Sequence, residues 1–358
     1  MICFFCATPY HIMLSIIIKE NHFKAQSADI VIYNHFHGAK NLYEKILDTG
    51  IFKNVYFFNE NNSSIKNRFK RIYHSIFPQK VIQRIANNSH YSEMIFFALD
   101  FLNISYIIKR YHRSHKKCIF SYGEDGMGTY MEPIYVPNKY LRLFLKITRR
   151  KQFLKKIKTL YVLVPHLLQC NNFKNIKQIG TAKNNEILTF CKQTLWSEGI
   201  GIQLKRVVYM QEPFYNDFSL NIDYIEHQIL DICNKIFQND FLIKLHPRTQ
   251  KFKYSSASIL RMNIPFELLL TESKPDSLII ISFLSTAAIT PGFLFGHTPY
   301  LIFTYELLAD KCPFINTEVT AFITELKKLK TCHERIFIPK TIEELKTILL
   351  ELHQKTNN

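Results

Sequence analysis

KCIFSYGEDG, residues 117–126, places a short apolar run directly before a polar segment that contains glycine. The run has the length and composition of a buried β-strand, so Glu124 and Asp125 fall where that strand ends. The chain has 46 Lys and Arg against 29 Asp and Glu, and only 10 glycines in 358 residues. Two acids and three glycines within residues 123–130 therefore stand out, and they predict either a loop that carries a site or an ordinary polar turn at the strand end.

Apolar runs of strand length recur along the chain and alternate with segments of helix length. In the first half these strands are expected at 2–7, 29–33, 54–58, 117–126 and 158–164, with a basic, aromatic and helical region over about 64–113. The pattern restarts at 205–213 and continues at 241–247, 277–285, 298–303 and 335–338. This alternation predicts an α/β protein with mostly parallel sheets.

The length of the chain favours two domains rather than one. We expect residues 1–195 and 196–358, joined near 185–204, with a terminal helix over 341–355. Thr341 and Glu344 form a capping box for that helix. Ligands of such sheets bind at the carboxyl ends of the strands, so a cleft between the two halves is the expected site.

Glu124 and Asp125 are adjacent, and adjacent side chains point in different directions. We expect one carboxylate to face a substrate and the other to hydrogen-bond to nearby backbone. Gly123, Gly126 and Gly128 permit tight turns and close approach of a ligand. The alternative interpretation is an ordinary polar turn after a strand.

A second candidate site follows the expected strand FLIKLHP. His246 can donate a hydrogen bond to a phosphate or act as an acid. Pro247 fixes the backbone after it, while Lys244 and Arg248 supply positive charge. The alternative is a surface histidine with charged neighbours.

SFLSTAA, residues 282–288, ends another apolar strand with Ser282, Ser285 and Thr286. Hydroxyl groups and free N–H groups at the start of a helix form an anion site, although an ordinary N-cap has the same residues. TPYH follows the first strand in the same way. Its residues Thr8, Pro9, Tyr10 and His11 are candidate substrate contacts, or a simple strand-to-helix turn with proline in the first helical turn.

Several classes of chemistry lack their usual motifs. The chain contains no D-x-D, no H-E-x-x-H, no phosphate-binding G-x-x-x-x-G-K-[ST] and no G-x-G-x-x-G. Cys3 and Cys6 have C-x-x-C spacing but lie in an apolar run without a second metal-ligand pair, so we expect structural thiols. The eight dispersed cysteines are typical of a reducing cytoplasm, and the N-terminus has no features of a signal peptide.

Three motifs in this order resemble those of the bacterial sialyltransferases. They are Glu124-Asp125-Gly126, His246-Pro247 and Ser285-Thr286. The opening ATPYH and the strand ending in QEP, residues 211–213, are similar to glycosyltransferase family 52, the lipooligosaccharide sialyltransferases. The resemblance extends from the first strand to about residue 305.

This resemblance implies a GT-B fold, with two Rossmann-like domains facing across a central cleft. It also implies an inverting transfer from CMP-sialic acid to a terminal sugar hydroxyl, such as that of galactose, without a metal or other cofactor. Asp125 would be the general base, with Glu124 as the fallback, and His246 would act on the departing phosphate. Donor contacts would come from the residues Lys244, Pro247, Ser282, Ser285, Thr286 and Gly126, and acceptor contacts from Thr8, Pro9, Tyr10 and His11.

The formal charge of +17 implies an anionic partner. A polysialyltransferase, or a hexosyltransferase of the same fold, remains an alternative, and a nucleic-acid-binding protein is a distant one because no recognised motif supports it. Residues 66–77 and 142–158 can form basic helices with an apolar side. In a protein expected in the cytoplasm they predict either a simply solvated basic face, which the sequence favours, or peripheral contact with an anionic membrane. The family resemblance suggests a homodimer.

Overall fold

The computed structural model divides the chain into Met1–Trp196 and Ser197–Asn358. The boundary expected from the sequence lies one residue earlier. The structure describes residues 1–36, 38–59, 80–87, 91–97, 101–115, 117–131, 139–149, 151–169, 172–182, 185–195, 204–212, 222–246, 249, 252, 254, 257–262, 264–271, 273, 275–308, 317–329 and 334–357.

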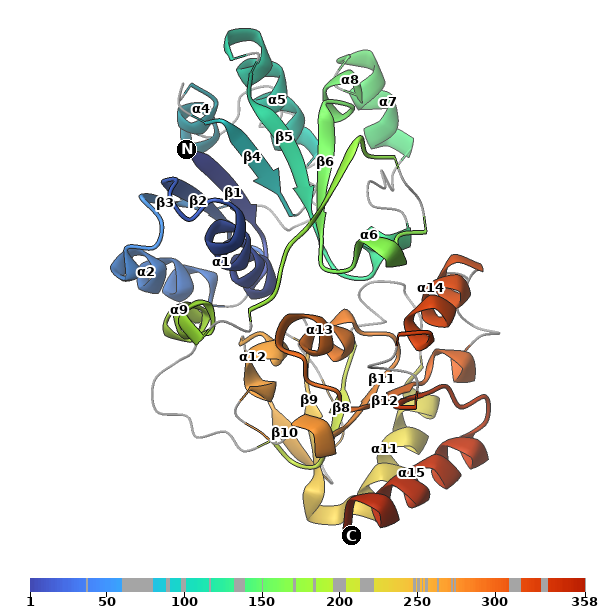
Figure 1. The fold of residues 1–358 in the computed structure, drawn as a ribbon. Helices are drawn as coiled ribbons and strands as arrows, with labels where there is room; N and C mark the ends of the chain where they lie inside the picture. The colour runs from blue at the N-terminus through green and yellow to red at the C-terminus, as the bar shows by residue number, and fades with distance from the viewer. Residues whose placement is uncertain are drawn as a thin grey trace. The chain divides into compact units, whose positions relative to one another are not determined.

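The N-terminal domain is a seven-stranded parallel sheet in the order β3-β2-β1-β4-β5-β6-β7. Its strands are β1 (Ile2–Cys6), β2 (Ala28–Tyr33), β3 (Asn54–Phe58), β4 (Glu93–Phe96), β5 (Ile119–Gly123), β6 (Ile157–Val162) and β7 (Asn175–Gln178). Its helices are α1 (Pro9–His22), α2 (Ala39–Thr49), α4 (Lys80–Asn87), α5 (Phe101–Ser114), α6 (Gly128–Met131), α7 (Lys139–Ile147), α8 (Lys151–Leu154) and α9 (Asn185–Leu195), with the 3₁₀ turn Pro165–Leu167. Helix α9 packs against α1 and α2, and α5 packs against α4 and α8 (Figure 1).

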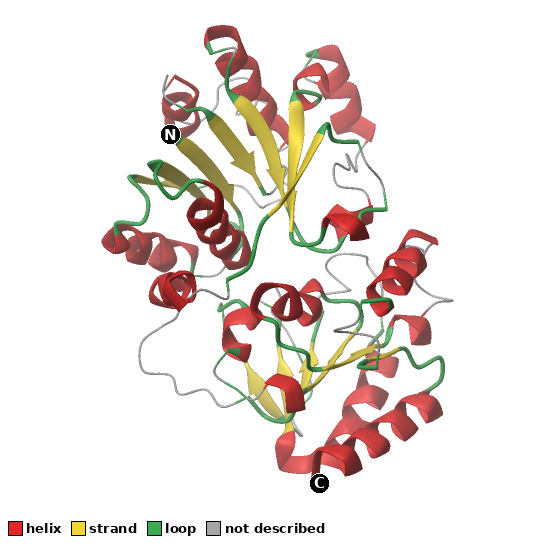
Figure 2. Ribbon diagram, in the orientation of Figure 1, coloured by secondary structure: helices red, strands yellow, loops and turns green. Residues whose placement is uncertain are grey.

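The C-terminal domain is a six-stranded parallel sheet in the order β10-β9-β8-β11-β12-β13. Its strands are β8 (Val207–Met210), β9 (Phe241–Lys244), β10 (Ser258–Leu260), β11 (Ile279–Ser282), β12 (Tyr300–Phe303) and β13 (Ile336–Phe337). Its helices are α11 (Asp223–Phe237), α12 (Phe266–Leu270), α13 (Thr286–Phe295), α14 (Thr317–Lys327) and α15 (Ile342–Asn357), with 3₁₀ turns at Gln238–Asp240, Pro275–Ser277 and Tyr305–Leu308. Helices α11 and α15 pack together, as do α12 and α13 (Figure 2).

These two parallel sheets confirm the predicted α/β class. The central strand β1 is buried along its whole length, as expected for a parallel strand covered on both faces. Cys3 and Cys6 are free, buried thiols within it, and three residues apart on a strand they point to opposite faces. Cys118, Cys191 and Cys233 are also free and buried, whereas Cys170, Cys312 and Cys332 lie outside the described residues.

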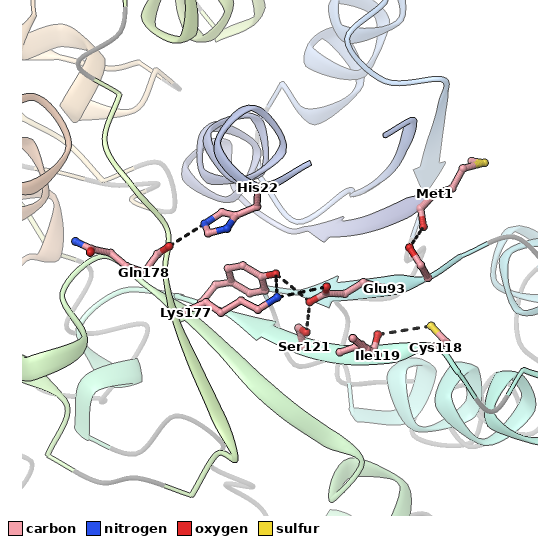
Figure 3. Close-up of polar contacts among 10 residues, drawn as sticks. Met1, His22, Glu93, Cys118, Ile119, Ser121, Lys177 and Gln178 are labelled. Atoms are coloured by element: carbon pink, nitrogen blue, oxygen red, sulfur yellow. Dashed lines mark hydrogen bonds and ion pairs between the residues drawn. The ribbon is translucent and has the colours of Figure 1, made fainter. Parts of the chain in front are cut away.

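The expected helical region over 64–113 is wrong in one place, because β4 occupies its middle, between β1 and β5. Residues 66–77 lie outside the described part of the chain. Glu93 begins β4, and its carboxylate is buried and satisfied by partners from other strands. Ser121 and Tyr161 donate hydrogen bonds to it, and Lys177 Nζ lies 3.8 Å from Oε2 (Figure 3).

Strands β7 and β10 were also absent from the sequence prediction. Both are edge strands with mixed, partly exposed residues, so neither has the apolar run that marks the central strands. Lys177 of β7 contributes to the Glu93 network, and His22 at the end of α1 lies 2.8 Å from the carbonyl oxygen of Gln178 (Figure 3). These contacts between distant segments hold the strand at the edge of the sheet.

Candidate active site

The N-terminal sheet changes direction between β1 and β4, which places a topological switch point at their carboxyl ends. Thr8 follows β1, Phe97 follows β4 and Glu124 follows β5. Because the strands are parallel and adjacent, these three strand ends lie at one edge of the sheet. The sequence-predicted carboxylates therefore lie where α/β sheets bind ligands.

Glu124 is buried at this edge, with 1% of its surface exposed. Tyr10 Oη donates to Oε1 over 3.0 Å, and Tyr130 Oη and the Leu163 N–H donate to Oε2 over 2.6 and 2.8 Å. Burial raises the pKa of Glu124 to about 7, against the opposing effect of these hydrogen bonds. A carboxylate enclosed in this way organises the loop and has no exposed surface for a substrate.

Asp125 is different, because 45% of its side chain is exposed. Its Oδ1 lies 2.6 Å from Nε2 of His11, which is buried on α1. The other ring nitrogen, Nδ1, accepts a hydrogen bond from the Ala7 N–H over 3.2 Å. This second contact assigns the ring proton to Nε2, so a neutral His11 donates to Asp125 and leaves Oδ2 to other partners.

The His11 ring is positioned by packing as well as by hydrogen bonding. Phe97 stacks on it with ring centroids 5.4 Å apart and an interplanar angle of 15°. Phe97 in turn lies over Gly123, where an added Cβ would approach its ring to 2.4 Å. The order Gly123, Phe97, His11, Asp125 is a continuous series of contacts that orients the exposed carboxylate.

Residues 8–11, the predicted acceptor contacts, also have structural roles in this domain. Thr8 caps α1 by accepting from the His11 N–H, and Pro9 occupies the first turn. Tyr10 and His11 each hold one member of the Glu124–Asp125 pair. Gly126 adopts φ +84°, a left-handed conformation that suits glycine, in the turn that follows.

In the C-terminal sheet the switch point lies between β8 and β11. Gln211 and Glu212, which follow β8, hydrogen-bond to the loops that follow the neighbouring strands β9 and β11. Neither residue was predicted individually as part of a site. Gln211 Oε1 accepts from Thr249 Oγ1 over 2.5 Å, which holds the turn after His246. Glu212 Oε1 accepts from the Leu284 N–H over 3.1 Å, which holds the loop before Ser285. The His246 and Ser285 loops are thus both attached to the end of β8.

The predicted donor residues occupy different environments in this domain. His246 and Ser285 are partly exposed, and Thr286 begins α13, whose N-cap Ser285 makes no side-chain capping bond. Ser282 is buried, and its hydroxyl accepts from the Ser285 N–H over 3.3 Å. Lys244 is buried too: desolvation lowers its pKa to about 8, opposed by attraction to Glu267. Pro247 and Arg248 lie outside the described residues.

Among the residues that the structure describes, no three His, Cys, Asp or Glu side chains gather as a metal site. In the same part of the chain, no helix is both long and apolar enough to cross a bilayer.

The sequence pattern of the alpha-2,8-polysialyltransferase family matches residues 2–302. The chain belongs to the alpha-2,8-polysialyltransferase family. The predicted sialyltransferase relationship is therefore confirmed at the level of the broader class, through this family rather than through family 52. No curated protein sequence matches this polysialyltransferase family member significantly.

Solved glycosyltransferase structures share the fold of this family member. TcCGT1 in complex with UDP has a TM-score of 0.55 and 11% identity, covering 100% of this chain and 92% of that one. Arabidopsis thaliana UGT89C1 complexed with quercetin has a TM-score of 0.51 and 10% identity, covering 100% and 90%. Phytolacca americana UGT2 has a TM-score of 0.52 and 8% identity, covering 99% and 91%. At these identities the likeness establishes the GT-B fold, and with the family match it makes the chain a glycosyltransferase.

Several residues of the site had no signal in the sequence. Phe97 and Tyr130 are two among 30 Phe and 19 Tyr. The Leu163 N–H is a backbone group, which no motif can identify. Phe97 directly follows β4, so its position at a strand end would have made it a candidate, but that strand was not predicted.

Replacing Glu124 with glutamine should reduce the dependence of stability on pH. In the folded protein Glu124 keeps its proton up to about pH 7, because burial raises its pKa from the ordinary value of 4.5 to about 7. The stabilising contribution of the neutral acid is thus complete below pH 4.5 and is lost as pH rises through 7. The free energy of unfolding of E124Q relative to wild type should rise by up to about 3 kcal/mol over this range.

Denaturant unfolding followed at several pH values measures this difference. Glu226 also has a pKa raised to about 7 by burial, so the variant must be compared with wild type at each pH. An E226Q variant reports that second group separately. Parallel curves for wild type and E124Q would show that Glu124 is already ionised in the fold.

Proposed function

We propose that this protein transfers sialic acid from CMP-sialic acid to a hydroxyl group of an acceptor glycan, with Asp125 as the general base. The observation that carries the proposal is the half-exposed Asp125 carboxylate, held by His11 at the carboxyl edge of a sheet in a polysialyltransferase family member. A carboxylate with one oxygen oriented and the other accessible suits removal of a hydroxyl proton.

The proposed reaction is a single displacement with inversion. The bond between the sialic acid anomeric carbon and the phosphate oxygen breaks through an oxocarbenium-like state, while the acceptor oxygen bonds to the opposite face. The acceptor proton passes to Asp125, and His246 stabilises or protonates the departing CMP phosphate. Ser285, as N-cap of α13, and Thr286 at its first position are suited to hold that phosphate through hydroxyl and backbone donors.

We propose that no metal takes part, with these donors carrying the phosphate charge. Lys244 supports this role at a distance, because it is buried and interacts with Glu267. We therefore assign it to the positive potential of the region rather than to direct phosphate contact.

The acceptor we propose is the terminal sialic acid of a growing chain, because the family match is to alpha-2,8-polysialyltransferases. The net charge of +17 suits a polyanionic product. A galactose-terminated lipooligosaccharide is the second candidate, supported by the likeness of the ATPYH and QEP segments to family 52.

Two assays test the proposal. Thermal shift with CMP, UDP and GDP should show selective stabilisation by CMP, since a ligand that binds the folded state raises its stability. Transfer from CMP-sialic acid should then extend an oligosialic acid primer and leave lactose unmodified. Preference for lactose would change the acceptor, and stabilisation by UDP instead of CMP would point to hexosyl transfer.

A further inference from the structure

Helix α7 presents an exposed face that is both basic and apolar. Lys139, Arg142, Leu143, Lys146 and Ile147 are three and four residues apart, so they share one face of the helix. All five are exposed, and Leu143 and Ile147 expose 55% and 71% of their surfaces. Leu145, with 1% exposed, attaches the opposite face of α7 to the domain.

The segment that carries this face is strongly basic. Residues 139–158 contain nine Lys or Arg and no Asp or Glu. Arg149, Lys151, Lys155 and Lys156 are exposed next to α7, in and around α8. A face with this potential attracts a polyanionic partner.

We infer that this face, the α7 face, docks the protein on an anionic lipid bilayer. Charge alone would suit an anionic glycan equally well. Two large aliphatic side chains held outward among the cations suit the boundary between lipid headgroups and acyl chains, where cations contact the headgroups and Leu143 and Ile147 enter the apolar layer. Exposed aliphatic groups gain nothing from a hydrated polysaccharide.

The location of α7 and α8 keeps this docking separate from the reaction. Helix α8 leads directly into the start of β6, whereas Asp125 follows the end of the neighbouring parallel strand β5 (Figure 1). The basic helices therefore lie near the amino ends of the strands of the N-terminal sheet, and the carboxylates lie at the carboxyl ends. Binding to a membrane leaves the carboxylate edge uncovered.

Vesicle co-sedimentation of the full chain tests the inference with two double variants. L143S/I147S removes the apolar pair, and R142Q/K146Q removes two cations. Helix α15 offers a matched control, because Lys346 and Leu350 are exposed four residues apart on a helix that also carries acids, so K346Q/L350S changes one residue of each kind elsewhere.

Wild type should bind vesicles of phosphatidylcholine with phosphatidylglycerol and should not bind phosphatidylcholine alone. R142Q/K146Q should weaken binding by about 30-fold, since each cation near an anionic surface contributes about fivefold. L143S/I147S should weaken it by at least about 10-fold, because buried methylene groups are lost from the bilayer. K346Q/L350S should bind as wild type does, and all three variants should retain activity on a soluble acceptor.

The inference is overturned if L143S/I147S binds vesicles as tightly as wild type, because the face would then be a site for polyanions in general. If soluble oligosialic acid then displaced vesicles equally well from wild type and from L143S/I147S, the polyanion bound by this face would be oligosialic acid. A change in oligomeric state in L143S/I147S, without loss of lipid binding, would instead make the α7 face an interface between copies of the chain and would also overturn it.

Discussion

Asp125→Asn should strongly reduce sialyl transfer while leaving the fold intact. Asparagine keeps an oxygen that can accept the hydrogen bond from His11, so the loop should retain its geometry. It cannot accept the proton of the acceptor hydroxyl at the attacking step. Loss of a general base of this kind lowers kcat by about 10²- to 10⁴-fold. Steady-state kinetics with CMP-sialic acid measures the loss, and circular dichroism and the melting temperature report the fold.

An Asp48→Asn variant is the matched control, because Asp48 is exposed on α2 in the same domain. It removes one negative charge from the domain without touching the strand-end loop, so its kcat should equal that of wild type. If D125N turned over at a near-normal rate, Asp125 would not be the base. Glu124, enclosed by Tyr10, Tyr130 and the Leu163 N–H, would then need a conformational change to reach an acceptor.

Gly123→Ala should lower both stability and activity, although residue 123 carries no functional group. The new Cβ would lie 2.4 Å from the Phe97 ring, so the ring must move. Overpacking of this kind costs about 1–3 kcal/mol. Because Phe97 stacks on His11, its displacement also shifts the partner of Asp125, and misplacement of a reacting group by about 1 Å can cost about 10²-fold in rate.

Gly128→Ala, at the start of α6 just after the same loop, is the control, since a Cβ at Gly128 meets no atom within 4 Å. Its free energy of unfolding and kcat should stay close to those of wild type. Denaturant unfolding and steady-state kinetics on both variants compare the two sites directly. A G123A enzyme with wild-type kcat would mean that Phe97 and His11 do not orient Asp125, even if stability fell as expected.

Most of the fold could be predicted from local pattern. The buried central strands are apolar runs, and a parallel sheet covered on both faces requires such runs. The strands that the sequence did not predict are those without an apolar run that clearly marks a strand. Strand β4 has an apolar run after Glu93, but a short run of this kind also fits a buried helix. The edge strands β7 and β10 are short, mixed in composition and partly exposed, so neither has the apolar run of a central strand.

The candidate site divides in the same way. The motif residues Asp125, His246, Ser285 and Thr286 could be found from their position after apolar runs. Their supporting partners could not, because Gln211, Glu212 and Phe97 act through contacts with loops distant in sequence.

By itself, the sequence determined that Glu124 and Asp125 lie directly after a strand and that adjacent side chains there point in different directions. It could not determine which of them is enclosed. The tertiary structure decided this through segments more than a hundred residues away, since Tyr10 donates to Glu124 and His11 donates to Asp125. The physical reason is that burial and hydrogen bonding depend on which distant groups the fold brings to a carboxylate, and a neighbouring position in the chain carries no information about that.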